Sequence, residues 1–277
     1  MKRNYFYLVA GLQDIALDTQ KLKVNITALK EELKMQLHQS DFRLSMMLFL
    51  PYDNANLLNI IQKKDKVFDS RGNFPQSYIE ENIKIPGDDL PEYFIHFIEA
   101  YNANEDIIPG MSSENQLTSL FYNFMEAQPN KFLKNWFSFY QTLNNLTTAL
   151  LSRKYNLPYE DQIIGNGLIP DAIRKSNARD FGLSAELDFL EDLLNIVKID
   201  NVQEREKAVD QIKWQYLDEV TFFEYFTIEK IMAYIIKLGI VERWLSIDKS
   251  HGEILFKELL DNMKSSYELP KQFTDKK

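Results

Sequence analysis

The chain has 277 residues, of which 45% are hydrophobic and 26% charged, and its formal net charge is −9. These proportions are ordinary for a globular protein, whereas the negative charge argues against nucleic acid as a partner, because phosphate binding needs a basic face. The chain contains no cysteine, which excludes disulfides, thiol nucleophiles and cysteine zinc sites and fits a reducing cytoplasm. Nine glycines and nine prolines are few for this length and favour long helices over many short strands.

The first apolar segment, YFYLVAG, covers Tyr5–Gly11. Its composition is typical of a strand, but the same residues also suit the first apolar turn of a helix. With Met1-Lys2-Arg3 in front it opens like a signal peptide, yet the apolar run stops at Gln13-Asp14 and no small-residue cleavage site follows, so we reject that interpretation. No segment reaches the roughly 20 apolar residues that a membrane span needs, and we expect no direct membrane insertion.

In the first half of the chain, apolar residues recur at helical spacing and predict a run of helices. The predicted segments are Thr27–Gln39, Asp41–Leu50, Asn54–Lys64, Gln76–Ile83 and Pro91–Tyr101. We expect Pro51 to end the second of them, because proline breaks the interior of a helix.

The longest helical pattern of the chain, Lys131–Tyr155, lies in the second half. The helix before it is expected to open with a capping box from Ser113 to Gln116 and to stop at Pro129. Further helices are predicted at Ser184–Lys198 with Ser184 as the cap, from Val209 to Phe223, and at Glu253–Met263. The polar tail Glu268–Lys277 is expected to fray.

Two loops rich in turn residues divide this pattern. Residues 102–111 contain Pro109-Gly110, and residues 158–170 contain Gly165-Asn166-Gly167. The sequence therefore predicts one elongated all-α domain over residues 1–277, a multi-helix bundle with little or no sheet and with lobe hinges near these two loops.

The most apolar long segment is Thr227–Ile247, TIEKIMAYIIKLGIVERWLSI. Before Gly239 its polar residues cluster on one side of a helix, and after Gly239 they lie on nearly the opposite side. A straight surface helix cannot bury both apolar stripes against one neighbour. We therefore predict a bend, a break or near-complete burial around Gly239.

Candidate chemistry is sparse. Glu92, His96 and Glu99 share one predicted helical face, but the spacing of Glu92 and His96 is four rather than three, and no second copy of the motif occurs, which argues against a di-iron site. No phosphate-binding loop, dinucleotide fingerprint or nucleophile-elbow motif is found. We therefore expect no cofactor, no bound metal and no catalytic residue.

The polar run Gln141–Thr148 inside the longest helix has two interpretations. Asn144, Asn145, Thr147 and Thr148 cover more than one helical face, so some of them must face other helices or a wet cavity. They form either a strip that is hydrogen-bonded to neighbouring helices or a polar inner surface that receives a partner.

Three segments carry a family resemblance. YFYLVAGLQDIAL and FTIEKIMAYIIKLGIVERWLSID resemble a group of mostly uncharacterised bacterial proteins that are encoded beside components of V-type ATPases. The segment TLNNLTTALLSRKYNLP resembles a helix of the C-type subunit of V-type ATPases, whose eukaryotic counterpart is known by the letter d.

The resemblance implies an all-helical, funnel-like, non-catalytic protein with two or three lobes. It implies a place in the cytoplasm, at the inner face of the cell membrane, with the central-stalk rotor subunits and the membrane rotor ring of a V-type ATPase as partners. The chain is shorter than the archaeal C-type subunit and lacks its visible threefold repeat. On the matching helix, the resemblance places Asn145, Arg153 and Lys154 on an inner partner surface.

A second hypothesis needs no resemblance. The 19 Phe and 14 Tyr of the chain are the residue types that protein interfaces favour. The protein would then be a general helical scaffold or adaptor that binds another protein through an aromatic surface, and a large exposed patch of Phe and Tyr without a polar concavity would favour it.

Overall fold

The computed structural model describes residues 3–266, with side chains described for residues 3–248. In this part of the chain all regular secondary structure is helical and no strand occurs, which confirms the predicted all-α class. The helices are α1 (Phe6–Gly11), α2 (Ile26–Gln36), α3 (Gln39–Met46), α4 (Leu50–Ile61), α5 (Gln76–Asn82), α6 (Glu92–Ala103), α7 (Ser113–Glu126), α8 (Lys131–Tyr155), α9 (Leu168–Lys175), α10 (Leu190–Ile196), α11 (Val202–Val220) and α12 (Ile228–Ser266), with short 3₁₀ turns at Met47–Phe49 and Glu160–Gln162.

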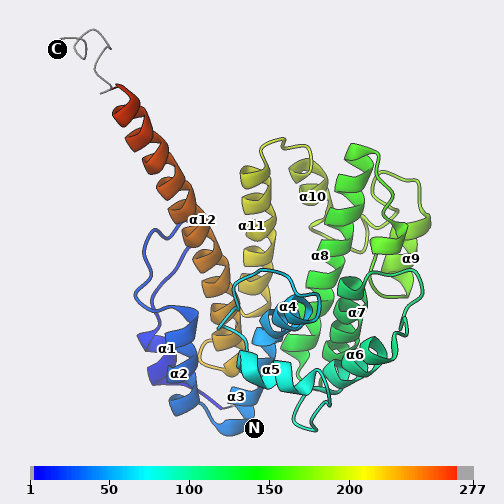
Figure 1. The fold of residues 1–277 in the computed structure, drawn as a ribbon, viewed down its shortest axis with the longest axis horizontal. Helices are drawn as coiled ribbons and strands as arrows, with labels where there is room; N and C mark the ends of the chain where they lie inside the picture. The colour runs from blue at the N-terminus through cyan, green and yellow to red at the C-terminus, as the bar shows by residue number, and fades with distance from the viewer. Residues whose placement is uncertain (1–2, 267–277) are drawn as a thin grey trace, which may run out of the picture.

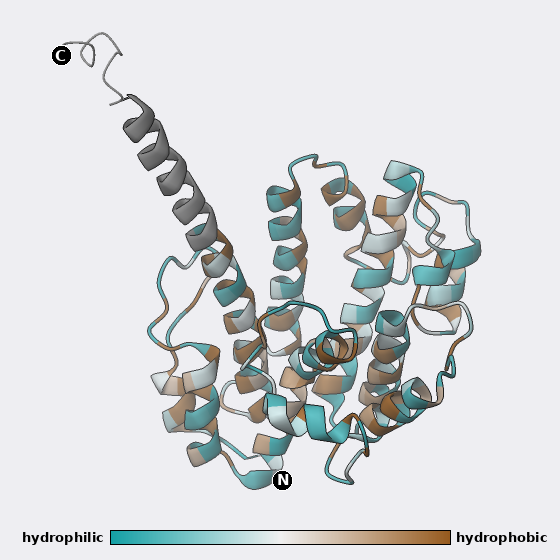
Figure 2. Cartoon of the chain, viewed as in Figure 1, coloured by the Kyte–Doolittle hydropathy of each residue, from teal (hydrophilic) through white to brown (hydrophobic). Residues whose placement is uncertain are grey.

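Helices that follow one another in the chain mostly pack side by side. α6 lies against α7, α7 against α8, α8 against α9, α10 against α11, and α11 against α12. α12 then returns to the beginning of the chain and packs on α2 and α3 (Figure 1). Hydrophobic residues lie mainly on the faces that the helices turn toward one another (Figure 2), as expected for amphipathic helices around a shared core.

The buried apolar residues form one continuous cluster from Leu8 to Leu238. α8 contributes its aromatic first half, in which Phe137 meets Phe121 of α7 edge to face, with ring centroids 5.0 Å apart. Such contacts between large rings bury much apolar area and add specific geometry. The cluster includes residues from both sides of each predicted hinge, and the division into lobes stays a prediction.

The N-terminal segment adopts the helical alternative, as α1, rather than a strand. Pro51 does not end a helix, contrary to the expectation. It occupies the first turn of α4, after the 3₁₀ turn Met47–Phe49. Proline is well tolerated there, because the first turn of a helix leaves its N–H groups unpaired and the ring already holds a helical φ.

The capping box predicted from Ser113 to Gln116 does not form, because the N-cap lies one residue earlier. Ser112 is the N-cap of α7, and its hydroxyl accepts a hydrogen bond from the Asn115 backbone N–H. Gln116 is buried instead, accepting from the Ile107 N–H at 2.9 Å and donating to the Met111 carbonyl at 2.7 Å. Gln116 thus anchors the 102–111 loop to α7.

The helix predicted at Ser184–Lys198 is wrong in its first half. Only Leu190–Ile196 is helical, as α10. The Ser184 hydroxyl donates to the Asp180 carboxylate at 2.6 Å, and Gly182 has a φ of 75°, which ends regular structure there. Local hydrogen bonding of this kind competes with a helix.

α12 runs without interruption through the predicted joint. No residue from Thr227 to Leu245 is exposed, although about half of them, Gly239 included, are only partly buried. The helix is thus covered on several sides around Gly239, without the break that was one of the three alternatives. A Cβ at Gly239 would lie 3.4 Å from Ile26 Cδ1 and 3.4 Å from Tyr52 Oη, which makes the residue a place of close helix approach. The segment Glu253–Met263 continues α12, and the tail Glu268–Lys277 lies outside the described residues.

Candidate functional site

The polar run of α8 is tied to the loop that follows the helix. Asn145, which is 4% exposed, donates from Nδ2 to the Ile164 carbonyl at 2.8 Å, and its Oδ1 accepts from the Ile164 N–H at 3.0 Å. Gln141 donates to the same carbonyl at 3.1 Å. The backbone N–H and C=O of Ile164 are buried and have no partner in a sheet or helix, so the Asn145 amide satisfies both of them.

The same loop is held from its other side by α9. Arg174 donates to the carbonyls of Ile163 and Gly165, at 2.7 and 2.6 Å. With Asn145 on the opposite side, these bonds clamp residues 163–165 between α8 and α9. Gln141 and Asn145 of the polar run are therefore hydrogen-bonded to a neighbouring segment of the chain, which is the first of the two interpretations.

Arg153 lies in the last turn of α8 and binds several groups of the segment that follows the helix. Its guanidinium stacks on the Phe181 ring, 3.9 Å from the centroid, and donates to Tyr159 Oη at 2.8 Å. It also donates to the carbonyls of Ser176 and Ala178. A planar fork of five donors suits such a place, where a lysine would satisfy fewer acceptors.

Lys154 performs a similar task on the neighbouring face. Its ammonium donates to the Val197 carbonyl at 3.1 Å and pairs with Asp200 at 2.8 Å. That ammonium holds the pKa of the exposed Asp200 carboxyl below its usual value. The polar groups of Asn145, Arg153 and Lys154 are thus engaged within the chain, and their place on a partner surface stays a prediction.

A second buried polar cluster joins α4 to the loop that precedes α5. Asp53 is fully buried, and its carboxylate accepts from the backbone N–H groups of Asn73 and Phe74 at 2.7 and 3.1 Å and from Asn73 Nδ2 at 2.9 Å. Burial raises the pKa of Asp53 to about 6, although these hydrogen bonds and the charge of Lys30 oppose the shift. A Cβ at Gly72 would collide with this carboxylate.

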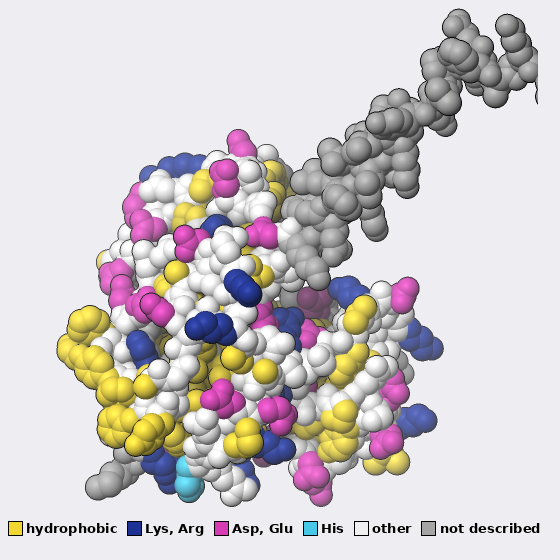
Figure 3. Space-filling view, turned by 90° about the vertical axis from the view of Figure 1, so that its left-hand side faces the viewer, with side chains coloured by type: hydrophobic (Ala, Val, Ile, Leu, Met, Phe, Trp, Pro, Cys, Tyr) yellow, Lys and Arg dark blue, Asp and Glu magenta, His cyan; other side chains and the backbone are white. Residues whose placement is uncertain are grey.

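A large aromatic patch lies where α1 meets the turn between α11 and α12. It consists of Phe6, Tyr7, Phe222, Phe223, Tyr225 and Phe226, whose exposed fractions range from 36% for Phe226 to 95% for Tyr7. The Tyr5 N–H donates to the Phe226 carbonyl at 2.7 Å, and the rings of Phe6 and Phe226 lie 4.7 Å apart. Figure 3 shows hydrophobic side chains gathered on the lower left of the face that it presents.

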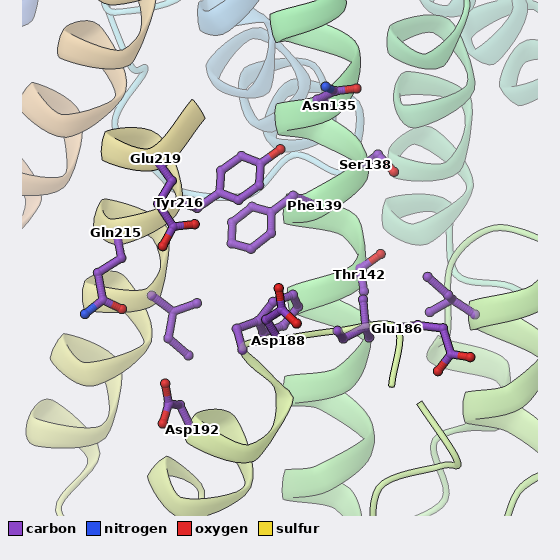
Figure 4. A pocket seen from close by; sticks show the side chains of 14 residues that line it. Asn135, Ser138, Phe139, Thr142, Glu186, Asp188, Asp192, Gln215, Tyr216 and Glu219 are labelled. Carbon is purple, nitrogen blue, oxygen red and sulfur yellow. The ribbon is translucent and has the colours of Figure 1, made fainter. Parts of the chain in front are cut away.

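An acidic cleft of about 500 Å³ opens between α8, α11 and the segment 186–192. Asn135, Ser138 and Thr142 of α8 form one wall, and Gln215 and Glu219 of α11 form the other (Figure 4). Rings of Phe139 and Tyr216 lie between the two helices, stacked with centroids 3.8 Å apart. Three further carboxylates line the cleft, from Glu186, Asp188 and Asp192.

Comparison with protein families gives a match over nearly the whole chain. The model of the family described as "Protein of unknown function (DUF2764)" matches residues 1–267. The chain belongs to this family. The comparison with curated proteins found no match, and the comparison with solved structures found none.

The structure of this DUF2764 member does not support the metal site considered for Glu92, His96 and Glu99. All three side chains are exposed on the outer face of α6. Over the described residues, no group of three or more His, Cys, Asp or Glu side chains is placed to hold a metal ion. In the same part of the chain, no helix combines the length and the apolarity that crossing a bilayer requires.

Sequence reasoning allowed for an aromatic surface but located neither surface of this DUF2764 member. Val220 and Phe223 lie at the end of the helix predicted from Val209 to Phe223, whose recurring apolar residues define a face for burial, but they are 39% and 80% exposed. α11 ends at Val220, so Phe223 falls in the turn and leaves the helical face. The run FFEYF at 222–226 is the signal that could have revealed the patch, because four aromatics in five residues cannot all face one core from a short turn.

Proposed function

We propose that the protein is a non-catalytic coupling subunit of a V-type rotary ATPase or ATP synthase. In this role it links the central rotor stalk to the membrane rotor ring and works in the cytoplasm, at the inner face of the cell membrane. The proposal takes its identity from the resemblance of the three segments described above. Its physical support comes from what the molecule exposes.

The aromatic patch is the observation that carries the proposal. Monomeric proteins rarely expose contiguous large apolar surfaces, and those that do mostly use them for binding. Phe, Tyr and Trp are the residues that dominate the buried centre of protein interfaces. Five of the six patch residues are more than half exposed, so a partner that covers them would remove a large apolar area from water.

The rest of the molecule is suited to transmitting force between partners. α8 and α12 are long helices, of 25 and 39 residues, and α8 and the first part of α12, as far as Leu238, are built into the continuous core. The acidic cleft gives the chain a second surface, of different chemistry from the patch. A subunit that connects two different partners needs two binding surfaces of different chemistry, and this helical protein has them.

A general helical adaptor is the second candidate, and the same aromatic patch favours it. The adaptor hypothesis predicts a partner outside any rotary ATPase. It also gives no reason for a separate polar concavity, whereas a coupling subunit needs a second contact. The identity of the partners therefore distinguishes the two.

The test is a pull-down of the tagged full chain from its native cell under gentle lysis, with the partners identified by mass spectrometry. The coupling-subunit proposal expects stalk and ring subunits to copurify in constant ratio. A chain that runs free while stalk subunits are present in the same lysate would overturn it. Constant copurification with an unrelated protein would replace it by the adaptor hypothesis.

A further inference from the structure

The acidic cleft is a built groove between two helices. α8 presents Asn135, Ser138 and Thr142 at positions that recur on one helical face, and α11 presents Gln215 and Glu219 one turn apart. No side-chain hydrogen bond to another described residue occupies any of these five side chains. The groove is therefore walled by polar groups that are free to bind a second molecule.

The floor of the groove is aromatic. Phe139 stacks on Tyr216 with an interplanar angle of 3°, and Phe189 meets Phe139 edge to face at 5.3 Å. Burial raises the pKa of Tyr216, and its hydroxyl has no hydrogen-bond partner among the described residues. These rings offer an apolar surface that the aliphatic stems of lysine and arginine side chains can cover.

The rim of the groove is acidic and uncompensated. Glu186, Asp188, Asp192 and Glu219 take part in no ion pair or side-chain hydrogen bond with another described residue, and no Lys or Arg lines the groove. Like charges around one hollow repel each other, and a cationic occupant removes that repulsion and adds charge-assisted hydrogen bonds.

We propose that this acidic cleft binds an arginine- or lysine-bearing segment of a partner protein. Glu186 and Glu219 lie on opposite sides of the groove (Figure 4), an arrangement that suits a chain segment with cations at intervals. The aliphatic stems of those side chains cover the aromatic floor while their charged ends meet the rim. The inference deepens the proposed function, on which it rests for taking the occupant to be a protein.

The test uses the purified full chain and a fluorescein-labelled peptide that carries arginine at alternate positions between serines. Binding is followed by fluorescence anisotropy at about 150 mM salt, where unspecific long-range attraction is screened. A peptide with citrulline in place of arginine keeps the shape and removes the charge. We expect the arginine peptide to bind and the citrulline peptide to bind at least about tenfold more weakly.

A matched pair of charge variants places the site. The triple variant D188N/D192N/E219Q neutralises the rim, and D88N/E92Q/E99Q neutralises three exposed carboxylates outside the cleft with the same change in net charge. We expect the first to weaken peptide binding about tenfold and the second by less than about twofold. Equal weakening by both would mean attraction to the overall negative charge and would overturn the proposal.

Two further outcomes would also overturn it. One is that the arginine peptide binds no better than the citrulline peptide. The other is that spermine binds more tightly than the peptide and loses that affinity in D188N/D192N/E219Q, in which case the occupant is a polyamine. The peptide experiment uses the isolated chain. Failure of the pull-down with success here would remove the rotary-ATPase role and leave the cleft as a basic-segment site.

Discussion

At the scale of single residues, the buried polar side chains of this protein hold loops to helices. Asn145 binds both backbone groups of Ile164, and Asp53 binds two backbone N–H groups of the loop before α5. Neither loop has a strand or helix partner of its own, so a side chain must satisfy its backbone. Such residues act on stability first and on function through the shape of the surfaces they support.

Replacement of Asn145 by alanine should destabilise the protein by about 2–3 kcal/mol, because it leaves the N–H and the carbonyl of nearly buried Ile164 without a partner. The urea midpoint reports this loss if the slope of the transition is unchanged. Asn144→Ala is the matched control, since the Asn144 amide makes only a long 3.4 Å contact with Tyr122 Oη. Equal losses for both variants would contradict the role given to Asn145.

Asp53 makes stability depend on pH in a stated direction. Because its folded pKa is raised to about 6 from 3.8, the folded state keeps a proton that the unfolded state has already lost. This group therefore lowers the free energy of unfolding as pH rises from about 4 to about 6, by about 3 kcal/mol in total.

Asp53→Asn removes the titrating carboxyl, so comparison with the wild type measures its contribution to the pH dependence of stability. The variant also gives up an acceptor for the Asn73 amide, so it should be less stable than the wild type at acidic pH. Its deficit should shrink as pH rises from about 4 to about 6. Urea denaturation of both proteins across this range measures the difference, and a deficit that grows with pH would contradict the raised pKa.

At the scale of elements, α12 shows how one helix is buried on two sides. It meets α11, α2 and α3, and residues on both sides of Gly239 contact α11, as Lys237 does through Asp218 and Trp244 through Asp210. Gly239 allows close approach to Ile26 of α2 and Tyr52 of α4. Gly239 does not have a positive φ, so the requirement there is for space and not for backbone freedom.

Gly239→Leu should therefore destabilise the protein by about 2 kcal/mol or more, because the added atoms overpack a filled contact. Gly239→Ala should change stability by less than about 1 kcal/mol, since its better helix propensity offsets a Cβ at van der Waals distance. Thermal and urea denaturation of the two variants check this order. A leucine variant as stable as the alanine variant would show that α2 and α4 can yield.

At the scale of the whole molecule, the aromatic patch and the acidic cleft are two separate surfaces, one suited to an apolar partner surface and the other to a cationic one. Residues near the N-terminus and residues of the turn before α12 make the patch, and α12 itself packs on the N-terminal helices α2 and α3. The cleft is made by α8, α11 and the segment between α9 and α11. Neither surface exists in any one element.

The patch should be needed for partner binding and dispensable for folding. The triple variant Tyr7→Ser, Phe222→Ser and Phe223→Ser removes rings that are 95%, 65% and 80% exposed, so it should change stability by less than about 1 kcal/mol. It should abolish copurification in the pull-down, whereas serine at the exposed residues Met35, Val67 and Ile85 outside the patch should not. Full copurification of the patch variant would place the interface elsewhere.

The sequence by itself determined the helical class and the span of its strongest elements. Lys131–Tyr155 was predicted with the bounds that α8 has, because a local cap, a long apolar period and closing cations agree there. The covering of α12 on several sides around Gly239 also followed from the pattern of one segment. These features depend on residues within one or two turns of each other, and the chain encodes them locally.

Only the tertiary structure decided which polar and aromatic residues are used internally and which are free. Arg153 and Lys154 look alike in sequence to solvent-facing cations, yet both reach carbonyls more than twenty residues away. FFEYF has the composition of a core segment, and it is exposed because α11 ends just before it. Long-range packing assigns each side chain its neighbours, and no local pattern contains that information.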